Sequence, residues 1–306
     1  MIEEADGAGF GRLSPSLISD WVKIGLLDNP DRVPRPPGQG RGALYLWPDH
    51  QRDLFLSLLK HRPGGNDIGR LLPIPVSVWL FWGDDFGVSI SQVRRALTSW
   101  SRSYQNHYAT EDRSLAYARL AVNGLAGPKA SREDKRLLRE ALTDALNQND
   151  WDQDRIAPLA LAVVDPGALG RSFGPFAMSP AEVISYLGSM IRGLSVLDEA
   201  SDGMLLEVRA RHREFISWYM RDWASRRSEP SFGDWFEEPT LDFIISGSCR
   251  DVVRHLGGMD IARQSGQDLP PVQLGTWPGL RATMGAAYPN IPPPEELPAP
   301  MSPVPM

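Results

Sequence analysis

The segment from Ser14 to Leu27, SPSLISDWVKIGLL, places the strongest constraint on how this chain folds. Ser14 can cap the start of a helix, and Pro15 has the fixed φ angle and the missing N–H that suit the first helical position. Apolar residues then recur at helical spacing, namely Leu17, Ile18, Trp21, Val22 and Ile24. Gly25 supplies a stop signal. The segment therefore predicts a short amphipathic helix.

The next segment, from Asp28 to Gly42, is rich in proline and glycine. It carries three arginines and no acid after Asp31, which predicts an exposed, positively charged loop. The arginines are Arg32, Arg35 and Arg41. Ala43 to Trp47 is short, apolar and aromatic, as a strand of a wing would be, and Pro48-Asp49 opens a further helix. Helix, basic loop, short strand pair and helix together predict a helix-turn-helix with a wing.

This order resembles the DNA-binding domain of the MerR family, in which the second helix commonly reads SPxTLRYYExIGLL. In that family a wing ending in tyrosine then leads to an Asp-bearing helix. The likeness covers residues 2 to 72, and residues 68 to 72 correspond to a fourth helix. The residues that fit the pattern are Ser14, Pro15, Trp21, Ile24, Gly25, Leu26, Leu27, Tyr45 and Asp49. Ser16 and Ser19 stand where the family often has arginine. Asp20 replaces an aromatic residue, and Lys23 keeps a positive charge.

The resemblance implies that the helix and the wing bind DNA. Arginine contacts to phosphates would set affinity and register, while short polar side chains on the helix would read base edges. The candidate DNA-binding residues are Arg12, Ser16, Ser19, Lys23, Arg32, Arg35, Arg41 and Tyr45.

The first helix of the motif has to come from residues 2 to 11. Glycines at positions 7, 9 and 11 each cost roughly 1 kcal/mol relative to alanine in a helix interior, so this helix is expected to be short or frayed. The same glycines form GxGxG. We do not interpret them as a phosphate-binding loop, because no strand precedes them and no Lys-Ser/Thr pair follows.

The composition is that of an ordinary globular protein, with 42% hydrophobic and 23% charged residues in 306 positions, and it predicts two domains. No apolar run approaches eighteen residues, and acids occupy the N-terminus where a signal peptide needs positive charge. A cytoplasmic protein without a membrane partner is therefore expected. Cys249 is the only cysteine, which excludes an internal disulfide, and its apolar neighbourhood predicts burial.

The chain is expected to be mainly α-helical and to have four parts. Residues 1–72 form the winged unit and 73–104 a bridging segment, in which Trp79, Phe81 and Trp82 are either core or an exposed interaction surface. Residues 105–265 show helical periodicity with a break at Gly257-Gly258, and no alternating strand pattern competes. Residues 266–306 contain eleven prolines, which predicts a flexible, disordered tail with polyproline II bias that either binds an aromatic groove or is only solvated.

No catalytic, metal or cofactor site is expected. The five histidines, at positions 50, 61, 107, 212 and 255, lack metal-binding spacing. Asp150, Asp152 and Asp154 alternate as in a calcium loop, but Arg155 and Leu161 replace the required glycine and glutamate, which favours a helix-capping acidic turn. No GxSxG element accompanies the serines, so a serine hydrolase is not indicated either.

The sequence favours a sequence-selective transcriptional regulator of bacterial type that binds double-stranded DNA. The net charge is −6, but residues 1–104 carry +1 and residues 105–265 carry −5, which suits selective rather than bulk DNA binding. The helical body would bind a small-molecule or protein effector or form a homodimer, although no sustained heptad pattern marks a coiled coil. Two alternatives remain open: an excisionase-like or plasmid-maintenance architectural protein, and a protein-interaction adaptor that has lost DNA affinity.

Overall fold

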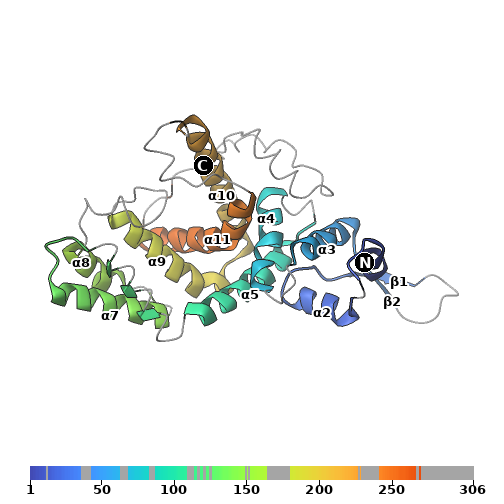
Figure 1. Cartoon of the computed structure of the whole chain (residues 1–306), viewed down its shortest axis with the longest axis horizontal. Coiled ribbons are helices and arrows are strands. Elements are labelled where there is room, and N and C mark those ends of the chain that lie inside the picture. The colour runs from blue at the N-terminus through green and yellow to red at the C-terminus, as the bar shows by residue number, and fades with distance from the viewer. Residues whose placement is uncertain are drawn as a thin grey trace. The chain divides into compact units, whose positions relative to one another are not determined.

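The computed structural model of the chain describes residues 1–11, 13–35, 43–62, 68–82, 87–108, 114–115, 118–119, 122–123, 126–148, 150, 152–163, 180–226, 228, 241–266 and 269. These residues are mainly helical, with one small two-stranded antiparallel sheet (Figure 1). Two compact units divide the chain. The first contains Met1–Trp100 and Thr240–Cys249, and the second contains Ser101–Pro239 and Arg250–Gly275. The proline-rich tail beyond residue 269 lies outside the described residues.

The first unit begins with short helices and a hairpin. Its elements are α1 (Ile2–Gly7), α2 (Pro15–Lys23), β1 (Asp31–Pro34), β2 (Ala43–Leu46), α3 (Asp49–His61), the 3-10 turn η1 (Ile68–Arg70), α4 (Pro73–Trp82) and the starts of α5 (Ile90–Tyr108) and α11 (Leu241–Gln264). The sequence signals for α2 are confirmed, because Ser14 Oγ accepts a hydrogen bond from the Ser16 backbone N–H at 3.3 Å and Pro15 is the first helical residue. The expected short first helix is also confirmed. Where a fourth helix was expected at residues 68 to 72, only the single turn η1 forms, and α4 follows it.

Strands β1 and β2 pair as an antiparallel hairpin. Arg32 lies opposite Tyr45, and Val33 lies opposite Leu44. Strand β1 lies within the segment that composition predicted to be a loop. The reason is that DRVP shows no apolar periodicity of its own, and all four residues are exposed, so only pairing with β2 defines the strand.

The core of the first unit is built around α4, in which every residue is buried. Trp79 and Phe81 are almost fully inaccessible, which confirms that this aromatic segment is core and not an exposed interaction surface. Trp21 of α2 meets Phe55 of α3 edge to face, with ring centroids 5.5 Å apart. Despite its apolar sequence α4 is short. Among the helices that the structure describes, none has both the length and the apolar character needed to cross a membrane.

The second unit is helical throughout most of its described residues. It contains the end of α5, then α7 (Arg132–Gln148), α8 (Gln153–Val163), α9 (Pro180–Val196), the 3-10 turn η4 (Leu197–Glu199), α10 (Asp202–Arg226) and the remainder of α11 (Leu241–Gln264). Helix α8 packs against α7 and α9. The acidic turn before α8 caps it as predicted, because Asp152 Oδ1 accepts from the Arg155 backbone N–H at 3.1 Å. In the first unit, Cys249 of α11 is buried, also as predicted.

The expected break at Gly257-Gly258 is wrong, because α11 runs through both glycines without interruption. A Cβ atom at Gly257 would overlap the Ser189 carbonyl oxygen in α9, and it would lie 2.9 Å from the Gly193 Cα. A Cβ at Gly193 would overlap the carbonyl oxygen of Val253 in the same way. The glycines therefore allow two helix backbones to approach closely, and they do not terminate a helix.

Adjacent glycine substitutions in α11 should have opposite effects. Gly257→Ala is expected to lower the free energy of unfolding by about 2–3 kcal/mol, because its methyl group meets backbone atoms that cannot rotate away. Gly258→Ala meets nothing closer than Ser189 Oγ at 3.4 Å, so it should gain about 0.5–1 kcal/mol from helix propensity. Urea denaturation of both variants measures these changes. Equal effects would contradict the close approach of α9 and α11.

Candidate nucleic-acid interface

Helix α2 has one buried and one exposed face. Ile18 and Trp21 are buried in the first unit. The opposite face is polar and exposed, and its residues are Ser16, Ser19, Asp20 and Lys23. These four positions are spaced by three, four and seven residues from Ser16, so they line one side of the helix. The face is polar, and apart from Lys23 its side chains are short, which suits close approach to a ligand surface.

The charges on this face belong to one ion pair. Lys23 Nζ lies 3.1 Å from Asp20 Oδ1, and both side chains are mostly exposed. The acid precedes the base by three residues, the spacing at which helical side chains meet. The pair is net neutral, so the exposed face of α2 carries a local dipole and no net charge.

The hairpin presents a second exposed surface. Arg32 and Tyr45 are cross-strand partners, so their side chains share one face of the two strands. Tyr45 is 61% exposed, and Arg32 and Arg35 are exposed as well. A guanidinium and an aromatic ring on one open face can contact phosphates and the faces of bases or sugars.

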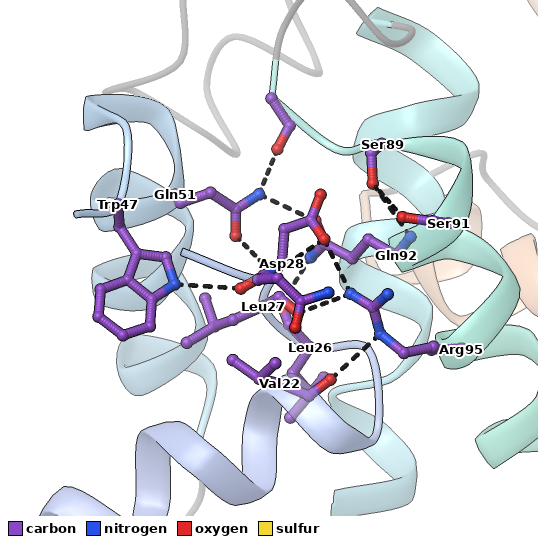
Figure 2. A network of polar contacts seen from close by, with 12 residues as sticks. Val22, Leu26, Leu27, Asp28, Trp47, Gln51, Ser89, Ser91, Gln92 and Arg95 are labelled. Carbon is purple, nitrogen blue, oxygen red and sulfur yellow. Dashed lines mark hydrogen bonds and ion pairs between the residues drawn. The ribbon is translucent and has the colours of Figure 1, made fainter. Parts of the chain in front are cut away.

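The turn between α2 and β1 is held by Arg95 of α5 (Figure 2). Its Nε donates to the Val22 carbonyl oxygen at 3.2 Å, and one terminal nitrogen pairs with Asp28 Oδ1 at 2.8 Å. The same nitrogen donates to the carbonyl oxygen of Leu27 at 3.5 Å. The Arg95 guanidinium thus holds both the end of α2 and the turn that follows it.

Two buried glutamines complete this network (Figure 2). Gln51 Nε2 donates to Gln92 Oε1 at 2.8 Å and also to the Gly87 carbonyl oxygen, while Gln51 Oε1 accepts from the Asp28 N–H at 2.8 Å. Gln92 Nε2 donates to the Leu26 carbonyl oxygen at 3.0 Å. Leaving either amide without its partner would cost about 1–3 kcal/mol, since both are buried. The network therefore locks α3 and α5 to the turn that follows α2.

The base of the hairpin is tied to the same turn. Trp47 Nε1, just after β2, donates to the Asp28 carbonyl oxygen at 3.0 Å (Figure 2). Asp28 is consequently held by Arg95, Gln51 and Trp47, which come from α5, α3 and the hairpin. The turn after α2 and the base of the hairpin are thus held together through one hydrogen-bonded residue.

His50 of α3 lies at the edge of this region, against Gly87. Burial lowers the pKa of His50, and this effect outweighs the opposing effect of the nearby Asp28 and Asp31 carboxylates. His50 is therefore neutral at neutral pH, and the positive charge of the region comes from lysine and arginine.

Six of the eight predicted site residues fall in the described part of the chain, and all six are exposed: Ser16, Ser19, Lys23, Arg32, Arg35 and Tyr45. Arg12 and Arg41 lie outside the described residues. Sequence reasoning missed the supporting residues Gln51, Gln92 and Arg95. One available signal was Gln51, a polar residue on the apolar face formed by Leu54, Phe55 and Leu58.

No protein-family model, curated protein or solved structure matches this chain at a significant level.

The second unit contains a histidine pair that the sequence did not reveal, with His212 buried and His255 half-buried. The rings of His212 in α10 and His255 in α11 lie 6.1 Å apart, and Phe215 packs against His255. His255 Nδ1 hydrogen-bonds to the Asp251 carbonyl oxygen at 2.7 Å. Burial, with the positive charge of Arg254 nearby, lowers the pKa of both histidines to about 3. Both rings are therefore neutral at neutral pH. Because the folded unit disfavours their protonation, its stability should fall in acid.

Among the described residues, no group of three or more His, Cys, Asp and Glu side chains is placed to hold a metal ion.

Proposed function

We propose that the first unit is a MerR-like winged helix-turn-helix domain that binds double-stranded DNA, and that the chain is a sequence-selective transcriptional regulator of bacterial type. The observation that carries this proposal is the link through Asp28. Through Asp28, the turn that follows α2 is tied to α3, to α5 and to Trp47 at the base of the hairpin, so the two elements that carry the exposed surfaces share one support. DNA recognition needs two such surfaces in a fixed relation, one for base edges and one for the backbone.

The hairpin and α2 would make different contacts with DNA. Arg32 and Arg35 of the hairpin would contact phosphates, and their contribution would fall with salt because counterions are released on binding. Ser16 and Ser19 would contact base edges, where a hydroxyl can donate and accept. The second unit would then act as an effector-binding or dimerisation module.

Removing a hairpin arginine should weaken binding to all DNA sequences. Arg32→Ala is expected to reduce the slope of log K against log salt by about 1, because one phosphate contact is lost. Fluorescence anisotropy with duplex fragments across a salt series measures this slope. The matched control is Arg155→Ala in α8 of the second unit, which removes the same charge from an exposed ion pair with Asp144. Equal slopes for wild type and Arg32→Ala would reject the hairpin assignment.

Ser16→Ala should instead change the preference among DNA sites more than the affinity for DNA.

The hairpin also offers one observation that favours a protein-interaction adaptor. Val33 and Leu46 lie on the face opposite Arg32 and Tyr45, and they are 37% and 50% exposed. The same face carries the acid Asp31 opposite Leu46, and exposed aliphatic side chains beside a negative charge fit a protein surface better than the phosphates of DNA. If the purified protein retains no duplex DNA even at low salt, this second function replaces the first.

A further inference from the structure

We propose that Asp20 and Lys23 act together to read a single C·G base pair in the major groove. This inference rests on the proposed binding of DNA by α2. Both residues lie on the exposed face of that helix with Ser16 and Ser19, and their side chains are 61% and 73% exposed. Asp20 would accept a hydrogen bond from the cytosine N4 amine, and Lys23 would donate to guanine O6 or N7.

The chemistry of the carboxylate selects the base. A carboxylate accepts hydrogen bonds and does not donate them, so it can pair only with an amine in the groove. The major groove presents two amines, cytosine N4 and adenine N6. The adenine amine lies beside the N7 acceptor of the same base, which repels a carboxylate, whereas the cytosine edge carries no acceptor in the groove. Asp20 therefore favours cytosine.

The spacing of the ion pair matches the spacing of the base pair. Within a C·G pair the N4 amine donates to guanine O6, so these atoms lie about 2.9 Å apart. Asp20 Oδ1 and Lys23 Nζ are 3.1 Å apart, so in the proposed complex the acceptor would face the amine while the donor faces O6. An A·T pair offers a similar amine and carbonyl, but the thymine methyl group stands beside its carbonyl oxygen. Guanine instead adds N7 as a second acceptor for the ammonium group.

Asp20 should contribute selectivity and lower affinity for bulk DNA. An acid on a surface that approaches phosphates is repelled by every sequence, so it weakens non-specific binding. A hydrogen bond from a cytosine amine to the Asp20 carboxylate would offset this repulsion, and only sites with cytosine at that position offer one. If Asp20 only stabilised the helix, replacing it would not change the base preference. If a residue contacted phosphate through a positive charge, removing that charge would lower the affinity for every sequence. Asp20→Asn distinguishes base reading from both of these roles, because it should change the base preference and raise the affinity for non-specific DNA.

The test is selection of binding sites from a random duplex pool by the full-length protein, followed by measurement of affinity for the selected and a scrambled duplex. Wild type should enrich sites with a fixed C·G pair. Asp20→Asn should lose about tenfold of the preference at that one pair, while its affinity for the scrambled duplex rises. Lys23→Gln should lose preference at the same pair and affinity for both duplexes.

A matched control is Glu140→Gln in α7 of the second unit, which removes one negative charge from another exposed helical ion pair. It should leave base preference unchanged at every position. If Asp20→Asn retains the wild-type preference, or if the two variants alter different base pairs, the shared reading by Asp20 and Lys23 is overturned while DNA binding stands. If wild type binds no duplex at low salt, both this inference and the proposed function are rejected.

Discussion

Gly25→Ala is expected to lower the free energy of unfolding of the first unit by about 3–5 kcal/mol. Gly25 is buried at the end of α2 and has a φ of +84°. An alanine there would adopt the left-handed region, at a cost of about 1–2 kcal/mol. Its Cβ would also overlap the Ala96 backbone nitrogen and lie 2.7 Å from the Gln92 carbonyl oxygen. These are backbone atoms of α5, so no side-chain rotation can relieve the overlap.

Gly9→Ala is the matched control for this effect. Gly9 has the same φ of +84°, but a Cβ there would meet nothing within 4 Å. It should therefore cost only the backbone strain, about 1–2 kcal/mol. Urea denaturation of both variants measures the two losses in the free energy of unfolding. Their difference gives the cost of the overlap with α5, apart from the cost of backbone strain. Equal losses in the two variants would mean that the approach of α5 to the end of α2 does not limit stability. Because α2 carries the proposed DNA-reading face, Gly25→Ala should also weaken DNA binding at temperatures where the protein remains folded.

Acidification should destabilise the second unit through His212 and His255. Each histidine has a folded-state pKa of about 3, well below the ordinary value of 6.5. The unfolded chain therefore binds more protons than the folded chain between pH 6.5 and pH 3. The stability contributed by neutral burial is fully present above pH 6.5 and is lost as the pH falls through this range. At pH 5 the loss is about 2 kcal/mol for each histidine, or about 4 kcal/mol for the pair.

Urea denaturation at pH 7.5 and pH 5.0 measures this loss, and the histidine ring resonances identify its source. In the folded protein the signals of His212 and His255 should not shift as protons are added, and they should change only when the unit unfolds. The charged neighbours Arg213 and Arg254 reinforce the neutral state, because they disfavour a second positive charge. His61 is exposed, so His61→Gln should leave the pH dependence of stability in place. Titration of either ring near pH 6.5 in the folded state would contradict the prediction.

Much of α2 followed from local signals. The Ser14 cap, the proline at position 15 and the apolar spacing of Ile18 and Trp21 all act within one or two turns, and the structure confirms each of them. The exposed positions of Ser16, Ser19 and Lys23 follow from the same periodicity. The acidic cap before α8 was also predictable, since Asp152 and Arg155 are only three residues apart.

The support for the candidate site was not predictable in this way. Gln51 and Gln92 are 41 residues apart, and Gln92 reaches the Leu26 carbonyl oxygen across 66 residues. Their amides are buried only because α3 and α5 pack against the turn after α2. Strand β1 likewise depends on its partner, because the segment from Asp31 to Pro34 has no alternation of its own.

The sequence by itself determined where helices such as α2 begin, which of their faces is polar, and that the chain is mainly helical. These properties depend on hydrogen bonds and side-chain contacts between residues at most four positions apart. Only the tertiary structure decided that Gly257 separates two helix backbones, that His212 meets His255, and that Asp28 joins α2 to the hairpin. Each of these depends on which elements pack together. That choice is set by burial of apolar surface over the whole chain and leaves no signal at a fixed spacing in the sequence.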